Sequence, residues 1–275
     1  MTAQSGLKPP VVFLHGGFCA GWAFDDWRKL FEAEGYETWA PSLPHHEIDW
    51  PEERPPDELA TLGLRAYTEH VAALVDNLDA PPIVVGHSLG GLIAQLLAAR
   101  RRLAGLVLLA PSAPWGVMPS SLREAFTPAA MTLMVGPYWL RTIPPDFAVA
   151  MENCFHLTPR RVAARAFDRF VPESGLATFE TWHWTWDPRR SSWVSPRAVK
   201  APVLVMVGEE DRVNPAATAQ SIARRYECAA DGFRAYPGHA HWLIEEDGWE
   251  RIANEALSWI GRLRTVETNR NLAPA

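Results

Sequence analysis

The chain is 275 residues long, which is enough for one large domain that buries its own hydrophobic core. Hydrophobic residues make up 48% of it and charged residues 21%, a balance that argues against both a disordered chain and a multispan membrane protein. The formal net charge of -6 excludes the basic surplus that a protein binding the phosphate backbone carries, so nucleic acid is not an expected partner.

The cysteines and the N-terminus bear on the compartment. Three cysteines stand far apart, at positions 19, 154 and 228, and neither close a disulfide framework nor show the paired spacing of a metal site. The first ten residues lack the order of a secretory signal, and no run approaches the roughly 18 apolar residues of a membrane span. We therefore expect a cytoplasmic monomer or homodimer that binds no membrane and no metal.

The first part of the chain alternates short apolar runs with stretches of helical period. Strands are expected at 11–14, 37–40, 83–85 and 106–109, each followed closely by glycine or proline. Helices are expected over 27–31, 62–78 and 92–99, and the proline-rich stretch 41–58 is expected to be a loop. Alternating strands and helices predict a mostly parallel, doubly wound sheet that is covered on both faces.

The alternation is interrupted and then resumes. Strands are expected at 202–207 and 233–236, helices near 216–226 and 248–264, and a frayed tail over 265–275. Residues 112–198, called the insertion below, show helical stretches around 121–126, 145–155 and 159–170 and no convincing strand. The predicted organisation is a core made of 1–111 and 199–275, with the insertion as a helical cap or lid.

The strongest motif is Gly86-His87-Ser88-Leu89-Gly90, which matches G-x-S-x-G. An apolar run precedes it and an apolar helical stretch follows it, as this motif requires. Glycines leave room for a strained turn that presents the serine hydroxyl above the sheet. We interpret Ser88 as a nucleophile; the alternative is a glycine-rich turn with an incidental serine.

A serine nucleophile needs a base and a third group that orients the base. Asp211 is the preferred acid because it follows the strand at 202–207, whereas the neighbouring Glu209 and Glu210 are interpreted as solvated turn residues. Two histidines compete as the base. We prefer His241, which directly precedes the aromatic residue and the acidic stretch leading into the last helix, and expect His239 to stabilise the turn. The chain order Ser, acid, His is the order expected of this architecture.

The end of the first strand supplies a second element of the expected site. In His15-Gly16-Gly17, backbone N–H groups can face the crevice and, together with the N–H of Leu89, bind the oxyanion of a tetrahedral intermediate. A simple tight turn is the alternative for this loop. His15 is interpreted as a structural residue that bonds the loop.

Thirteen tryptophans are unusual, and six of them lie in the insertion, which indicates a site enclosing apolar or aromatic matter. Core packing and pocket lining both remain open for these side chains. The proposed substrate contacts are Phe18, His87, Trp115, Trp139, Trp182, Trp184, Trp186 and Trp242. His45 and His46 are expected at a pocket edge or on the surface, because two adjacent side chains do not readily face one metal ion.

Taken together, these segments resemble the α/β-hydrolase superfamily over nearly the whole chain. The resemblance is carried by His15-Gly16-Gly17 with Trp22, by 86–91, by 208–211 and by His241-Trp242. It implies an α/β-hydrolase fold with an inserted cap, and it assigns Ser88 as nucleophile, Asp211 as acid, His241 as base and the backbones of Gly17 and Leu89 as oxyanion hole. The stretch 42–46 departs from the family, since many relatives carry an Asp and Gly-rich turn there.

The expected function is a serine hydrolase without cofactor, acting on a small-molecule ester, thioester or lactone with a bulky apolar or aromatic portion. One alternative uses the same triad for acyl transfer, cyclisation or C–C bond hydrolysis, because a fold does not specify its reaction. Another is a ligand receptor or carrier with a slow triad. The identity of the substrate is not predicted.

Overall fold

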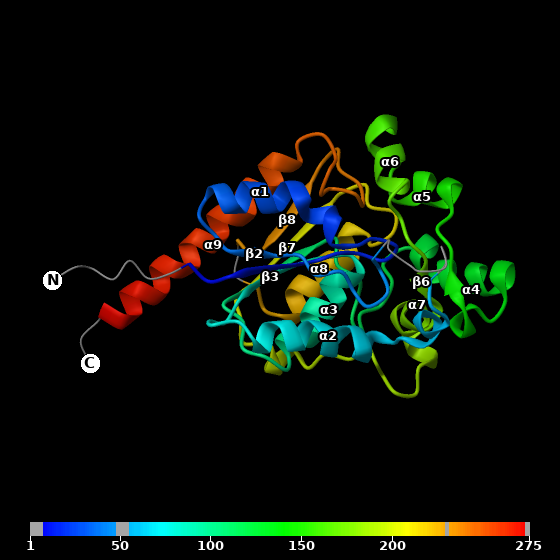
Figure 1. The fold of residues 1–275 in the computed structure, drawn as a ribbon, viewed down its shortest axis with the longest axis horizontal. Helices are drawn as coiled ribbons and strands as arrows, with labels where there is room; N and C mark the ends of the chain where they lie inside the picture. The colour runs from blue at the N-terminus through cyan, green and yellow to red at the C-terminus, as the bar shows by residue number, and fades with distance from the viewer. Residues whose placement is uncertain (1–7, 48–54, 229–230, 273–275) are drawn as a thin grey trace.

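The computed structural model describes residues 8–47, 55–228 and 231–272 (Figure 1). Six parallel strands form one sheet in the order β2-β1-β3-β4-β7-β8. Their bounds are β1 Val11–Leu14, β2 Thr38–Trp39, β3 Ile83–His87, β4 Gly105–Leu109, β7 Val203–Gly208 and β8 Phe233–Tyr236. The predicted mostly parallel α/β architecture is confirmed.

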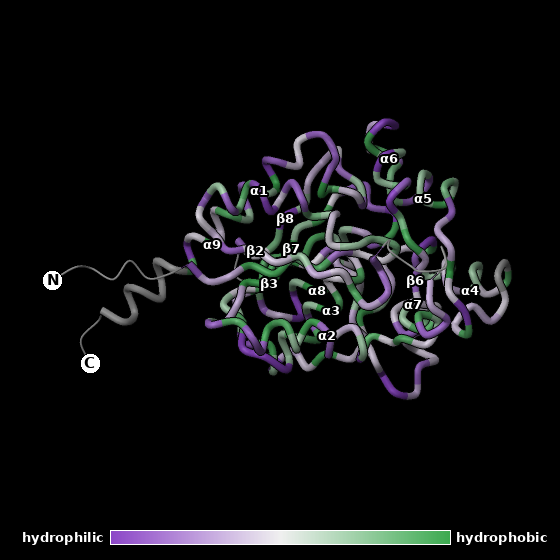
Figure 2. Tube along the Cα trace, viewed as in Figure 1, coloured by the Kyte–Doolittle hydropathy of each residue, from purple (hydrophilic) through white to green (hydrophobic). Residues whose placement is uncertain are grey.

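The central strands are continuous apolar runs because both faces of the sheet are covered. Every residue of β3, β4 and β7 is buried, and Figure 2 shows apolar colouring on the labelled strands β3 and β7 as well as on the helices beside them. The strand order changes direction between β1 and β3, which pair with Leu14 opposite Gly86. In a sheet of this kind a crevice opens at the carboxyl ends of the strands beside such a switch point. The loops that follow β1 and β3 therefore meet there.

Five helices cover the sheet. They are α1 (Asp25–Ala33), α2 (Leu64–Asp76), α3 (Leu89–Ala98), α8 (Ala216–Arg225) and α9 (Trp249–Leu272). Figure 1 shows α1 and α9 on one side of the sheet and α2, α3 and α8 on the other. The expected frayed tail over 265–275 is wrong as far as Leu272, because α9 continues to that residue. No glycine or proline stands between 265 and 272, so nothing in the chain stops the helix there.

The longer elements of residues 112–198 are helices. They are α4 (Leu122–Val135), α5 (Phe147–Asn153), α6 (Arg160–Phe167) and α7 (Gly175–Trp182). Two features correct the sequence analysis: α7 was not expected, and β5 (Thr142–Ile143) pairs antiparallel with β6 (Glu173–Ser174). Two-residue strands have no period from which they can be predicted. Among the described residues between β4 and β7, none joins the six-stranded sheet.

Among the residues that the structure describes, no helix combines the length and the apolar character that a membrane crossing requires.

Candidate active site

Three side chains converge at the carboxyl ends of β3, β7 and β8. Ser88 follows β3, Asp211 follows β7, and His241 follows β8. The Nε2 atom of His241 lies 3.0 Å from Ser88 Oγ, and its Nδ1 atom lies 2.9 Å from Asp211 Oδ2. A carboxylate only accepts hydrogen bonds, so Nδ1–H donates to Asp211 and Nε2 accepts the hydroxyl proton of Ser88. The structure thus brings together the three residues selected from the sequence.

The turn at Ser88 explains the glycines of the motif. Ser88 has φ 53° and ψ -118°, a conformation that residues with a side chain rarely adopt. A Cβ atom on Gly86 would lie 2.5 Å from the carbonyl oxygen of Gly90, and one on Gly90 would lie 2.2 Å from that of Leu14. Only glycine fits at both positions. The tight packing of β1, β3 and α3 therefore holds the strained turn and presents the hydroxyl.

Replacing Gly90 with alanine is expected to destabilise the fold by about 3 kcal/mol or more, because the new methyl group meets two backbone carbonyls. Those carbonyls belong to Leu14 and His15, at 2.2 and 2.4 Å. Gly261→Ala is the matched control: it lies inside α9, and beyond the backbone of its own helix and its chain neighbours nothing lies within 4 Å of the added Cβ. Its expected effect is a gain of about 0.5–1 kcal/mol. Denaturant unfolding curves measure both, and equal midpoints for the two variants would contradict the packing argument.

The acid is held by its own loop. Oδ1 of Asp211 accepts hydrogen bonds from the backbone N–H groups of Val213 and Asn214, both at 2.8 Å, which leaves Oδ2 for His241. The competing Glu210 is exposed and accepts instead from the N–H of Gly238 at 3.0 Å. Because both oxygens of Asp211 have fixed partners, this carboxylate can orient the imidazole.

His239 and His241, which lie in the same loop after β8, contact different partners. His239 Nδ1 lies 3.3 Å from Glu246 Oε2, and the same carboxylate oxygen accepts from the N–H of Ala240 at 2.8 Å. His239 therefore lies with a buried carboxyl group beside the turn, whereas His241 alone contacts both Ser88 and Asp211.

Two other buried histidines support the site. The N–H of Leu43 donates to His15 Nε2 at 2.9 Å, so the ring proton is on Nδ1, which donates to the carbonyl of Gly16 at 2.8 Å. His87 Nε2 lies 2.9 Å from the carbonyl oxygen of His241. Burial, followed by the charge of a neighbouring histidine, lowers the pKa of each ring to about 3, so both imidazoles are neutral. His87, proposed as a substrate contact, is thus buried against the backbone of His241 and does not lie at an open surface.

Gly17 and Leu89, the residues expected to supply the oxyanion donors, are neighbours in the fold. A Cβ atom on Gly17 would be 3.9 Å from Leu89 Cδ2, and Leu89 begins α3. The N–H groups of these two residues have no hydrogen-bond acceptor among the residues that the structure describes. Unpaired N–H groups, one of them at a helix N-terminus directly after Ser88, are the kind of donor that the predicted oxyanion hole requires.

The proposed aromatic contacts fall in several environments. Trp242 is buried and its ring packs 5.1 Å from that of Phe155, whereas Trp186 is 77% exposed. Among the partly buried residues, the rings of Trp115 and Trp184 pack 5.4 Å apart. The ring of Trp139 packs 5.2 Å from that of Phe179. Trp182 is partly buried in α7, and Phe18 is partly exposed beside Gly17.

A buried polar cluster lies beside residues 15–18, which are called the oxyanion loop below. The cluster was not predicted from the sequence. The Glu173 carboxylate, 1% exposed, accepts from Tyr67 Oη at 2.8 Å and lies 3.2 Å from His46 Nε2. Burial opposes both charges, but their mutual attraction and hydrogen bonding outweigh it: the pKa of His46 is raised and that of Glu173 lowered. The expectation that His46 lies at a pocket edge or on the surface is wrong, because it is fully buried as the partner of Glu173.

No sequence signal marks Glu173, a single acid in Phe170-Val171-Pro172-Glu173-Ser174 without a motif around it. Its partner His46 lies 127 residues away in the chain, and only folding brings the two together.

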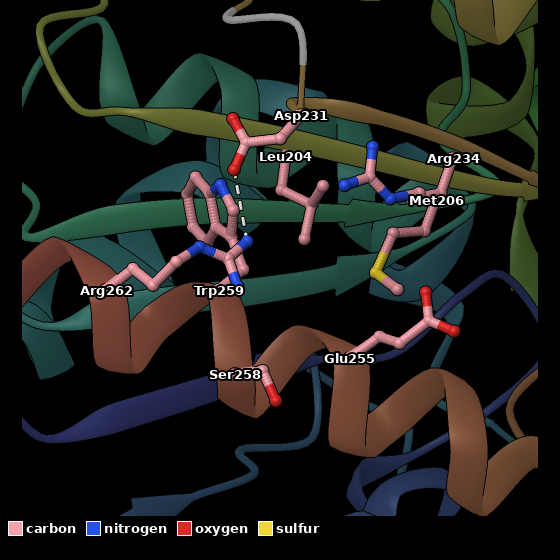
Figure 3. Close-up of a pocket in the computed structure, with 8 residues that line it drawn as sticks. All are labelled: Leu204, Met206, Asp231, Arg234, Glu255, Ser258, Trp259 and Arg262. Carbon is pink, nitrogen blue, oxygen red and sulfur yellow. Dashed lines mark hydrogen bonds and ion pairs between the residues drawn. The ribbon is translucent and has the colours of Figure 1, made fainter.

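One cavity of about 90 Å³ lies between α9 and the strands β7 and β8, and Figure 3 shows Asp231 and Arg262 paired at its edge, 3.1 Å apart. Neither Ser88 nor Asp211 nor His241 lines it.

Within the described ranges, no group of three His, Cys, Asp or Glu side chains is arranged to hold a metal ion.

The fold is that of an α/β hydrolase. Residues 11–255 match the sequence profile of the Alpha/beta hydrolase family, and the chain belongs to that family.

Individual proteins are similar to this chain, either in the sequence of one stretch or in fold. A pyrethroid hydrolase of Sphingobium wenxiniae is 32% identical over 103 residues, which are 36% of this chain and 34% of that protein, so the match spans about a third of this relative. The monoacylglycerol lipase of Paleococcus ferrophilus superposes with a TM-score of 0.67 at 19% identity, covering 94% of this chain and 97% of the other. A pyrethroid hydrolase from Sphingobium faniae JZ-2 gives 0.64 at 20%, covering 92% and 98%. These structures share the fold.

Proposed function

We propose that the chain is a serine hydrolase that cleaves an ester, thioester or lactone with a sizeable apolar or aromatic portion, through an acyl-enzyme. The observation that carries the proposal is the continuous contact from Asp211 through His241 to Ser88, at 2.9 and 3.0 Å. Membership of the α/β hydrolase family and the resemblance of one stretch to a pyrethroid hydrolase support the same reaction class.

In the first half of the proposed reaction, Ser88 Oγ attacks the carbonyl carbon while His241 Nε2 takes the hydroxyl proton. The carbonyl π bond breaks and its electron pair becomes the oxyanion, which accepts hydrogen bonds from the N–H groups of Gly17 and Leu89. Asp211 stabilises the imidazolium that forms. When the tetrahedral intermediate collapses, the imidazolium gives its proton to the departing alkoxide, or to the thiolate of a thioester.

In the second half, a water molecule takes the place of the leaving group. His241 removes one of its protons as the water oxygen attacks the acyl carbon of the Ser88 ester. Collapse of this second intermediate breaks the bond to Ser88 Oγ, which regains a proton from His241. The products are a carboxylic acid and the alcohol or thiol, and a lactone gives a hydroxy acid.

We propose that the insertion, residues 112–198, is the cap over this site and that its aromatic side chains favour apolar substrates. Phe18, partly exposed beside Gly17, and the contact between Trp115 and Trp184 support an apolar surface. The buried position of Trp242 favours a packing role for this residue.

The direct test is hydrolysis of p-nitrophenyl esters with short, long and aromatic acyl groups, together with one pyrethroid ester. We expect turnover that rises with the apolar size of the acyl group, and a fluorophosphonate adduct that intact mass and peptide mapping locate on Ser88. Tight binding of apolar ligands with neither turnover nor an adduct would instead favour a carrier.

Asp211→Asn is expected to lower kcat by about 10⁴-fold, because an amide cannot hold the imidazole in the required tautomer or stabilise its charge. Glu210→Gln is the matched control, since Glu210 is one residue away and exposed. Initial rates on one p-nitrophenyl ester measure both variants. If the Glu210 variant lost the larger share of activity, the assignment of the acid would fail.

A further inference from the structure

The insertion binds both backbone polar groups of one residue in the oxyanion loop. The N–H of Phe18 donates to Glu173 Oε2 at 3.3 Å, and the carbonyl of Phe18 accepts from the N–H of Val171 at 2.9 Å. Phe18 follows Gly17, the proposed oxyanion donor. The segment around β6 is therefore in direct contact with the oxyanion loop, and the proposed reaction depends on the geometry of this loop.

Phe18 needs such restraint. Its φ is 63°, in the left-handed region that residues with a Cβ atom avoid. The preceding residue is a glycine, which does not restrict its own backbone. The peptide that joins Gly17 to Phe18 is consequently oriented by its hydrogen bonds and not by local preference. A Cβ atom on Gly17 would lie 3.3 Å from Glu173 Oε2, so the carboxylate also packs against Gly17 itself.

Both oxygens of the Glu173 carboxylate have polar partners. Oε1 accepts from Tyr67 Oη at 2.8 Å and from the N–H of Ser174 at 2.7 Å, while Oε2 faces Phe18 and His46. Both ring nitrogens of His46 face acceptors, Glu173 Oε2 at 3.2 Å and the carbonyl oxygen of Pro44 at 3.0 Å, which favours the protonated ring as the partner that offsets the charge of this buried carboxylate.

We infer that Glu173 is a positioning residue: by accepting from the N–H of Phe18 and packing against Gly17, it holds Gly17, and with it the N–H that binds the oxyanion of the tetrahedral intermediate, in place. The inference rests on the proposed function. If Glu173 has this role, a side chain of the insertion supports the oxyanion hole. The insertion then contributes to the chemical step as well as to substrate binding.

Glutamine at position 173 separates this role from simple packing. Both carboxylate oxygens accept hydrogen bonds, and the Oε1 side faces two donors, Tyr67 and the Ser174 N–H. The single amide oxygen of glutamine is expected to face those two donors, which turns the NH₂ group toward Phe18 and leaves its N–H without an acceptor. The side chain keeps its size, so the fold is expected to persist.

Glu180 provides the matched control. It is another buried carboxylate of the insertion, and it accepts from the N–H of Leu64 at 2.6 Å and from Ser191 Oγ at 2.8 Å. It joins the insertion to α2 without contacting the oxyanion loop. Glutamine at 180 can keep both bonds, because its amide oxygen accepts from Leu64 while the hydroxyl of Ser191 turns to accept from the NH₂ group.

The experiment compares the wild type, Glu173→Gln and Glu180→Gln for kcat and KM on a p-nitrophenyl ester and for the rate of labelling by a fluorophosphonate. For Glu173→Gln we expect kcat and the labelling rate to fall by about 10 to 100-fold with KM nearly unchanged, because the defect is a misplaced oxyanion donor. For Glu180→Gln both rates are expected to match the wild type.

Circular dichroism shows whether each variant is folded. Should Glu173→Gln be unfolded, Glu173→Ala, which removes the acceptor without adding an amide donor, is measured in its place with the same expectation. A folded Glu173 variant with the kcat and labelling rate of the wild type overturns the inference and leaves the proposed function standing. A wild-type protein that neither hydrolyses esters nor is labelled overturns the proposed function, and the inference with it.

Discussion

Ser88→Ala is expected to lower kcat for ester hydrolysis by roughly 10⁶-fold, because the variant has no oxygen with which to form the acyl-enzyme. In the folded chain this oxygen lies 3.0 Å from the base. Any activity left would come from the oxyanion donors and from binding alone. Initial rates on a p-nitrophenyl ester, followed by intact mass after fluorophosphonate treatment, measure the loss of both turnover and labelling.

Ser112→Ala is the control for this variant. Ser112 lies next to the strained turn, where its backbone N–H donates to the carbonyl of Ser88 at 3.0 Å, but its hydroxyl does not contact His241. The alanine variant keeps that backbone bond, so its rate is expected to stay close to that of the wild type. A Ser88→Ala protein that retained more than about one hundredth of the wild-type rate would show that another group is the nucleophile.

His241→Ala is the second variant expected to have a very large effect, again a loss of roughly 10⁶-fold in kcat. The imidazole is the only described side chain that contacts both Ser88 and Asp211, so without it the hydroxyl proton has no acceptor at the moment of attack. The same ester assay measures the loss, with unfolding curves to show that the variant is folded.

His239→Ala tests the choice between the two histidines. The chain places His239 two residues earlier in the same loop, but its Nδ1 atom lies 3.3 Å from Glu246 Oε2 and contacts no triad residue. We expect a change in stability, with kcat kept within about an order of magnitude. If instead the His239 variant were inactive and the His241 variant active, the two roles would be reversed.

The predictable parts of this protein are local in the chain. The strands at 83–85 and 106–109 are apolar runs buried on both faces, so their hydropathy reports their position directly. The geometry around Ser88 is equally local, since G-x-S-x-G between a strand and a helix meets a steric requirement that only glycine satisfies. Asp211 was selectable because the carboxyl ends of parallel strands share one edge of the sheet.

The features that escaped prediction depend on partners far away in the chain. The two-residue strands β5 and β6 exist through their pairing with each other, and α7 begins where the Ser174 side chain accepts from the N–H of Ala177. The extension of α9 to Leu272 was missed for a different reason, because a polar stretch without glycine or proline can be either helix or tail when judged by hydropathy alone.

The amino-acid order alone determined the class of fold, the strained serine turn and the order of Ser88, Asp211 and His241 that the proposed mechanism uses, because these follow from periodicity, from the size of glycine and from the common edge of parallel strands. Tertiary structure decided which of His239 and His241 reaches Ser88, and it placed Glu173 against Phe18 across 155 residues of chain. Hydrogen bonds between distant segments form only when packing brings their donors and acceptors within about 3 Å, and no spacing along the chain encodes that distance.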